Sequence, residues 1–158
     1  MKRMLKVAAV LAALLVLAAF VLVRDGERII PEGEGRVELD VGEFEAFPLP
    51  DYAAAVVRDD YKSYFIEVEP GIKIHVLDIG EGYPVYLQHG NPTTGLLYRK
   101  VVESLPLDRV RAIMPTMVGL GFSTKVPASE HILDNHMRWM NSVLTTLNLT
   151  EVVFVGQD

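Results

Sequence analysis

Hydrophobic and polar residues alternate along residues 64–68 and again along residues 72–78. This period of two is typical of β-strands that bury one face, and the Glu-Pro-Gly sequence at residues 69–71 has the composition of a turn. The pattern predicts an antiparallel hairpin with one solvent-facing side. Lys73 and His75 fall on that side, so His75 is interpreted as a solvated strand residue rather than a ligand.

Three short segments with mostly apolar residues follow, at residues 84–87, 110–114 and 152–155, and the second contains Arg111. The last is an unbroken series of β-branched and aromatic residues, as expected for a strand that is buried on both faces of a parallel sheet. Each run leads directly into a polar or glycine-containing segment. The sequence therefore predicts three strands, each ending in a loop that could carry chemistry.

Two amphipathic segments separate these strands. Residues 96–105 have apolar side chains at four-residue spacing and stop before Pro106, which predicts a helix. A longer helix is predicted over residues 129–147, with Ser129 as its N-cap. The apolar positions of the first helix are Leu97, Val101 and Leu105. Those of the second are Leu133, Met137, Met140, Val143, Leu144 and Leu147.

Strands and helices thus alternate along the second half of the chain. Such alternation predicts right-handed crossovers in a parallel sheet with helices on both faces. The predicted fold class is therefore α/β, with a hairpin ahead of parallel strands and flanking helices.

The N-terminal residues have a different pattern. Residues 7–23 are apolar throughout and follow Lys2, Arg3 and Lys6, which indicates that residues 1–23 are a signal anchor or a signal peptide. No Ala-x-Ala sequence precedes the polar region, so the uncleaved anchor is favoured, with residues 4–23 in the membrane. The positive end should stay in the cytoplasm and the rest of the chain outside it. Cleavage would instead give a secreted or periplasmic protein.

Residues 24–46 are charged and contain several glycines, so they are predicted to be an extended linker. The chain carries a net charge of −6, and its positive N-terminal end makes the remainder more acidic still. An acidic surface argues against a nucleic-acid partner, because phosphate binding needs a basic face. The absence of cysteine excludes disulfides and thiolate zinc sites.

The second predicted helix contains four side chains of metal-binding type near its start. Glu130, His131, Asp134 and His136 lie at helical spacing, but no further ligand accompanies them. They are interpreted as a solvated helix face, and Trp139 as a packing residue. No metal is predicted.

The last strand runs into Gly156-Gln157-Asp158. A strand that ends in a Gly-x-nucleophile turn resembles the nucleophile elbow of the α/β-hydrolases. A carboxylate stands here in place of serine, so the resemblance is to the Asp-nucleophile branch, the haloalkane dehalogenases and epoxide hydrolases. Asp is also a favoured helix N-cap, which is the alternative interpretation of Asp158.

The resemblance implies roles for a small set of residues. Asp158 would be the nucleophile that forms an alkyl-enzyme ester. Asn91 would supply a backbone N–H to the oxyanion hole, and its side chain could contact the halide. The resemblance also implies that neither cofactor nor metal is required and that substrates are small, apolar halogenated or epoxide compounds. The predicted supporting residues are His89, Gly90, Pro92 and Gly156.

Further segments share the resemblance. Residues 47–52 resemble the lead-in to the first strand of haloalkane dehalogenases, and residues 115–123 resemble the family loop Pro-Asp-x-x-Gly-x-Gly-x-Ser, with Thr116 in place of Asp. Residues 47–158 are therefore predicted to be the N-terminal half of a catalytic domain, inactive by itself because the general base and its supporting acid are missing. Epoxide hydrolysis is the alternative activity, and a non-catalytic, membrane-tethered binding module is the alternative class.

Overall fold

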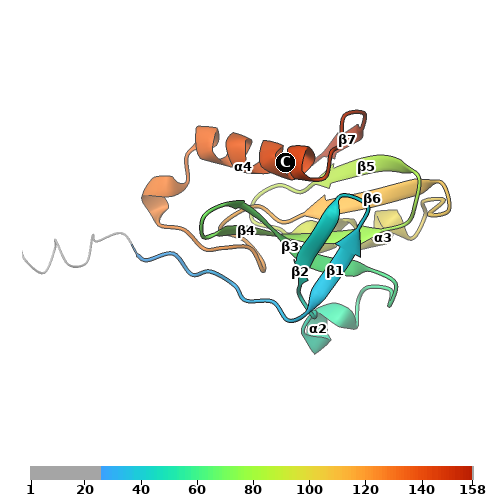
Figure 1. The fold of residues 1–158 in the computed structure, drawn as a ribbon, viewed down its shortest axis with the longest axis horizontal. Coiled ribbons are helices and arrows are strands. Elements are labelled where there is room, and N and C mark those ends of the chain that lie inside the picture. Colours follow the sequence, from blue (N-terminus) through green and yellow to red (C-terminus); the bar gives the residue numbers. More distant parts are fainter. Residues whose placement is uncertain (1–25, 158) are drawn as a thin grey trace, which may run out of the picture.

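Seven strands form one sheet in the order β1-β2-β3-β4-β6-β5-β7 in the computed structural model, which describes residues 26–157 (Figure 1). The strands are β1 (Arg36–Leu39), β2 (Gly42–Ala46), β3 (Lys62–Glu69), β4 (Ile72–Ile79), β5 (Tyr83–Gln88), β6 (Val110–Pro115) and β7 (Val153–Gly156). The helices are α2 (Asp51–Ala54), η1 (Gly95–Tyr98), α3 (Arg99–Val102), η2 (Ala128–Glu130) and α4 (Leu133–Thr146), of which η1 and η2 are 3-10 helices.

The sheet is mixed. Strands β1 to β4 pair antiparallel in sequence order, and β4 also pairs antiparallel with β6. β5 pairs parallel with both β6 and β7. The predicted hairpin and the predicted parallel crossovers are therefore both confirmed, with the hairpin joined to the parallel part through β4.

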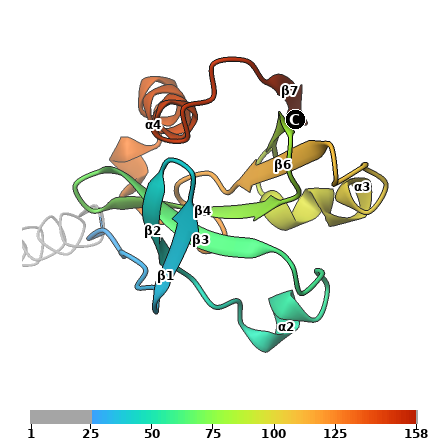
Figure 2. The same ribbon diagram turned by 45° about the vertical axis from the view of Figure 1, so that its right-hand side comes forward.

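Helices cover the two faces of this sheet (Figure 2). On one face α4 packs through Trp139 and Val143 onto a core that includes Tyr64, Ile74 and Tyr86. On the other face η1 and α3 pack through Tyr98 and Val102 onto a second core, which includes Leu77, Leu87 and Met114. The α/β class and the packing role of Trp139 are confirmed.

The predicted linker is wrong for residues 36–46, which form β1 and β2. Val37 pairs with Phe44 across this hairpin, and the Phe44 ring lies 5.3 Å from that of Tyr64 on β3. Gly42 has a φ of 136°. Residues with a side chain rarely adopt this backbone conformation, so glycine suits the turn. These few apolar residues sufficed to extend the sheet because β3 offered an unpaired edge. The predicted domain boundary at residue 47 stays a prediction.

The expectation that the β3–β4 hairpin has a solvent-facing side is also wrong. β4 lies between β3 and β6, and most of its residues are buried. His75 is 1% exposed, because Phe47 and Phe122 from distant segments pack against its ring. The alternation in sequence could not reveal a cover that comes from elsewhere in the chain.

Both predicted helices are shorter than expected, and the residues that they bury differ from those predicted. In the first, Tyr98 and Val102 are buried, whereas Leu97 and Val101 are 37% and 50% exposed, so the apolar face is displaced by one residue. The second begins at Leu133 rather than 129, and its N-cap is Ile132, which makes no side-chain capping bond. Leu133 and Met137, predicted to be buried, are 74% and 61% exposed.

The last strand is present but not buried as predicted. β7 pairs on one side with β5 and stands at the edge of the described sheet. The exposed fractions of Val153, Phe154 and Val155 are 48%, 57% and 38%.

The N-terminal segment and Asp158 lie outside the described residues. Within residues 26–157 no helix is long and apolar enough to cross a membrane. The anchor, the side of the membrane on which the domain lies and the alternative of secretion all stay predictions.

Candidate functional site

The carboxyl ends of β5, β6 and β7 meet at one edge of the sheet, because the three strands run parallel. In open α/β sheets this edge is where ligands bind. Gln88 pairs with Gly156, and the backbone N–H of Gln157 donates to the Gln88 carbonyl over 3.1 Å. The pairing brings the start of the loop at residues 89–92 beside the end of β7.

A second hydrogen bond holds the same carbonyl. The Tyr98 hydroxyl donates to the Gln88 oxygen at 2.7 Å, and the Gln88 side chain donates to the carbonyl of His89 at 2.9 Å. Sequence reasoning missed Tyr98 and Gln88, since neither residue type nor spacing marks a residue that acts on a backbone carbonyl.

His89 joins the loop after β5 to the loop after β6. Its Nε2 accepts from the N–H of Met117 at 2.9 Å, so the ring proton belongs on Nδ1, which donates to the Gly90 carbonyl at 2.8 Å. Burial lowers the pKa of His89 and so favours this neutral form. With both nitrogens engaged, His89 orients the loop and has no lone pair left for proton transfer, which supports the predicted structural role.

Asn91 and Pro92 are exposed at the tip of this loop, and their peptide bond is cis. The Thr93 N–H and hydroxyl both donate to the Gly90 carbonyl, at 3.0 and 2.7 Å. Asn91 is therefore an exposed residue in a turn just beyond the carboxyl end of β5.

Residues 116–123 after β6, which we call the glycine loop, are held by their own Thr116 and Ser123 side chains, which bond backbone groups of η1, β4 and the loop. The Thr116 hydroxyl accepts from the Gly95 N–H at 3.1 Å. The Ser123 hydroxyl donates to the Thr116 carbonyl at 2.6 Å and accepts from the N–H of His75 at 2.9 Å. Thr116 therefore supports the loop although the family resemblance has Asp at this position.

Two glycines of this loop have no room for a side chain. A Cβ at Gly119 would lie 2.3 Å from the His131 ring, and one at Gly121 would lie 2.7 Å from the Thr94 methyl group. Both have positive φ, of 91° and 44°, a region that L-residues seldom occupy. The glycine pattern thus reflects packing and backbone geometry rather than a phosphate-binding site. By contrast, a Cβ at Gly156 would meet only a Phe154 carbon at 3.5 Å.

His75 lies in a buried aromatic cluster next to the glycine loop. Its ring centroid is 5.3 Å from that of Phe47 and 5.2 Å from that of Phe122. The Ser63 hydroxyl donates to the Phe47 carbonyl at 2.6 Å, so it accepts from His75 Nε2 at 2.9 Å. Burial lowers the pKa of His75 to about 3.

This pKa predicts that the protein loses stability as the pH falls from about 6.5 toward about 3. The unfolded chain takes up a proton on His75 in this window and the folded chain does not, so the free energy of unfolding falls by up to about 1.4 kcal/mol per pH unit. Urea unfolding of the protein and of His75→Gln at about pH 7 and about pH 5 measures the effect. The variant should show the smaller pH dependence, and His131→Gln, at an exposed histidine, serves as the control. Equal slopes for His75→Gln and the parent would contradict the assignment.

Two of the residues that were predicted to form a solvated helix face contact each other. His131 Nδ1 and His136 Nε2 lie 3.1 Å apart and their rings stack, whereas Asp134 is exposed. Within residues 26–157 no three His, Cys, Asp or Glu side chains are grouped so that they could hold a metal ion.

A model of the alpha/beta hydrolase fold family matches residues 83–158, the part that contains β5, β6, β7 and their loops. Haloalkane dehalogenase 2 of Mycobacterium tuberculosis is 36% identical over 86 residues, which are 54% of this chain and 30% of that protein. Residues 83–158 thus match the α/β-hydrolase superfamily. The haloalkane dehalogenase of Psychrobacter cryohalolentis is 34% identical over 118 residues, 70% of this chain and 36% of that protein.

Solved structures of haloalkane dehalogenases and epoxide hydrolases are similar to this chain as well. The haloalkane dehalogenase DatA from Agrobacterium tumefaciens superimposes with a TM-score of 0.60 at 32% identity, over 66% of this chain and 35% of that one. The epoxide hydrolase VrEH1 from Vigna radiata has a TM-score of 0.57 at 27% identity, over 63% of this chain and 31% of that one. The chain thus resembles dehalogenases and epoxide hydrolases, and it spans about a third of the length of its curated relatives.

Proposed function

We propose that this chain contributes the nucleophile and the oxyanion loop of a haloalkane dehalogenase-like hydrolase. The observation that carries the proposal is the parallel pairing of Gln88 with Gly156, together with the hydrogen bond from the Gln157 N–H to the Gln88 carbonyl. Asp158 follows Gln157 directly in the sequence. The pairing therefore supports a site shared by Asp158 and Asn91.

In the proposed reaction a carboxylate oxygen of Asp158 attacks a carbon that bears a halogen. A carbon–oxygen bond forms, the carbon–halogen bond breaks, and the halide leaves with the bonding electrons, next to the Asn91 amide. An aspartate needs no base for this step, because it is ionised at neutral pH. Water then hydrolyses the ester at its carbonyl carbon, while the Asn91 N–H and the N–H of the residue after Asp158 stabilise the oxyanion.

The hydrolytic step also needs a general base to activate water. His75 and His89 are buried and hydrogen-bonded, and His131 and His136 contact each other. We therefore propose that the base comes from outside residues 1–158, and we expect these residues alone to show no turnover.

The first test is to read the DNA beyond codon 158. An open frame that encodes a small-residue-rich continuation and a later histidine would support the proposal, and the product of the complete frame would then be assayed for halide release. A stop codon at this point would overturn the catalytic proposal and favour the non-catalytic, membrane-tethered module.

Epoxide hydrolysis is the second candidate, favoured by the likeness to the Vigna radiata epoxide hydrolase. The same carboxylate would open an epoxide ring, and hydrolysis of the ester would yield a diol. Incubation of the complete protein with a bromoalkane and with an aliphatic epoxide, followed by measurement of free bromide and of diol, distinguishes the two activities.

Asn91→Ala should slow halide release by about 10- to 100-fold and affect epoxide opening less. The substitution keeps the backbone N–H but removes the side-chain amide, whose hydrogen bond to a charged halide is worth about 1.5–3 kcal/mol. Asn91 is exposed, so unfolding should be unchanged. Steady-state rates of bromide release measure the effect, with Lys100→Ala on the exposed side of α3 as the control. If the rates with both substrates fell equally, Asn91 would have no specific role in halide binding, and the substitution would act only through the conformation of the loop.

A further inference from the structure

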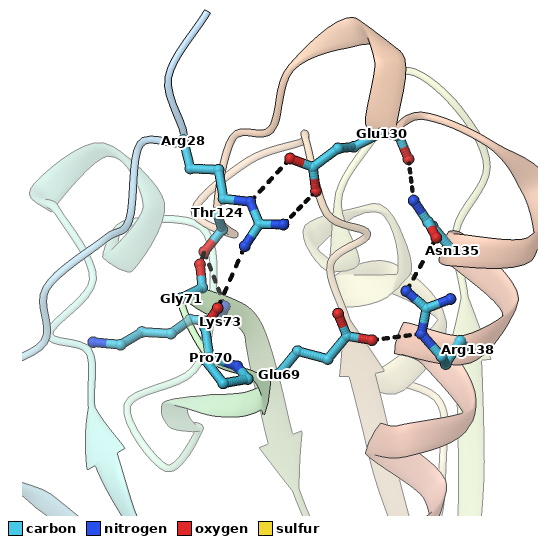
Figure 3. Close-up of polar contacts among 9 residues, drawn as sticks. All are labelled: Arg28, Glu69, Pro70, Gly71, Lys73, Thr124, Glu130, Asn135 and Arg138. Atoms are coloured by element: carbon cyan, nitrogen blue, oxygen red, sulfur yellow. Dashed lines mark hydrogen bonds and ion pairs between the residues drawn. The ribbon is translucent and has the colours of Figure 1, made fainter.

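Residues 28–33, which we call the strap, are bonded along the folded domain although they were predicted to be part of a linker. The Arg28 guanidinium makes two hydrogen bonds to the Glu130 carboxylate, Nε to Oε1 at 3.0 Å and a terminal nitrogen to Oε2 at 2.6 Å. It also donates to the carbonyl of Pro70 in the β3–β4 turn at 3.4 Å. Arg28 thus joins the turn of the hairpin to η2 (Figure 3).

Backbone and side-chain contacts continue this attachment. The N–H and carbonyl of Ile29 pair with the carbonyl and N–H of Lys125, both at 2.9 Å. Lys73 Nζ donates to the Pro31 carbonyl at 3.1 Å, and the Gly33 N–H donates to a Glu45 carboxylate oxygen at 2.6 Å. The strap is therefore fixed at both ends and in the middle.

Side-chain contacts also join to one another the elements to which Arg28 is bonded. Arg138 on α4 pairs at 2.5 Å with Glu69, the last residue of β3, and donates to Asn135 Oδ1 at 3.0 Å. The Asn135 amide donates to the carbonyl of Glu130 at 2.9 Å. These contacts connect the turn, η2 and the first turns of α4 into one support for Arg28 (Figure 3).

The strap lies at the end of the domain that carries the candidate site. Lys125 and Glu130 fall between the carboxyl end of β6 and the start of α4. In both ribbon views the blue start of the described chain lies on the side toward which the β6 arrow points (Figures 1 and 2). Two apolar side chains of the strap are exposed there, Ile29 at 69% and Ile30 at 46%.

The length of chain before the strap limits how far this end can stand from a membrane. The predicted membrane segment ends at Val23, five residues before Arg28, and five extended residues span at most about 17 Å. A flexible linker would let the domain tumble, but a bonded strap transmits the position of the anchor to the sheet. Exposed isoleucines beside a membrane segment suit the apolar part of the interface.

We propose that the strap orients the carboxyl edge of the sheet toward a lipid bilayer, with Ile29 and Ile30 in contact with the lipid. The proposal rests on the predicted membrane segment and is independent of the chemistry at Asp158. Its consequence is that the candidate site opens toward the phase in which small apolar compounds concentrate.

The absence of cysteine allows a clean test. The single variants Ile30→Cys, Ala128→Cys in η2 and Tyr83→Cys of the full chain are each labelled with a fluorophore. Each is reconstituted into vesicles of phosphatidylcholine and phosphatidylglycerol that contain a nitroxide-labelled lipid. Tyr83 begins β5 at the opposite edge of the sheet and is 49% exposed, close to the 46% of Ile30. Probes at 30 and 128 should be quenched severalfold more than the probe at 83.

A second variant separates orientation from mere proximity to the anchor. Arg28→Gln removes the bidentate pair with Glu130 and leaves the other strap contacts, so quenching at 128 should decrease toward the level at 83, while quenching at 30 persists. Equal quenching at 128 and 83 in the parent chain, or no quenching at any position, would overturn the proposal. So would quenching at 128 that is insensitive to Arg28→Gln.

Discussion

Asp158→Asn is expected to abolish the hydrolysis of haloalkanes and epoxides alike in the complete protein. The amide is nearly isosteric with the carboxylate, but it carries no charge and is a poor nucleophile toward saturated carbon. Removing a nucleophile usually costs several orders of magnitude in kcat, so a loss of at least about 10³-fold is expected. Stopped assays of bromide and diol would measure it.

Controls for this experiment follow from the structure. Asp108→Asn changes a side chain that is 80% exposed at the opposite edge of the sheet and should leave both rates unchanged. Mass spectrometry of the parent during turnover should detect an alkyl adduct on the peptide that contains Asp158. Full activity in Asp158→Asn, or an adduct on another residue, would show that Asp158 is not the nucleophile.

Arg111→Met is expected to destabilise the fold by about 3–5 kcal/mol, the usual effect of removing one partner of a buried ion pair. The Arg111 guanidinium bonds both carboxylate oxygens of Asp78, which is 2% exposed, and the Tyr64 hydroxyl donates to the same carboxylate at 2.8 Å. The hydrogen bond to Asp78 raises the pKa of Arg111, and burial raises that of Tyr64. Methionine would leave the Asp78 charge buried without a cation.

The double variant Asp78→Asn/Arg111→Met tests the cause. Asparagine removes the charge but keeps an acceptor for the Tyr64 hydroxyl, so the double variant should recover a large part of the stability lost in Arg111→Met. Urea unfolding at neutral pH gives both values. If the double variant were less stable than Arg111→Met, the loss would come from packing and not from the uncompensated charge.

Much of the parallel part of the sheet could be predicted because its signals are local. Residues 84–87 and 110–114 are short segments, apolar except for Arg111, that lead into loops, and a crossover between such strands has only one common hand. The loop at residues 89–92 follows the first of these strands, and the turn at residues 156–158 follows the strand predicted at residues 152–155, so parallel pairing predicted that the two lie close together. The assignments of Asp158 and Asn91 stay predictions.

The errors arose where burial depends on distant segments. The alternation around His75 predicted a wet face, but Phe47 and Phe122 cover it. The charged residues 36–46 were predicted to be a linker, but the free edge of β3 supplied hydrogen-bond partners for β2. The ion pairs of Arg28 and Arg111 span 102 and 33 residues of sequence, a separation at which residue types carry no pairing signal.

Local backbone preference and apolar period thus determined from the sequence alone which segments of residues 64–156 become strands and helices, and in which order, but not that residues 36–46 form two strands. The tertiary structure decided which faces are buried, that burial lowers the pKa of His75 and His89, and that the strap lies on the domain. The reason is physical: periodicity depends on neighbours along the chain, whereas burial and pKa depend on whatever the folded chain places against a side chain.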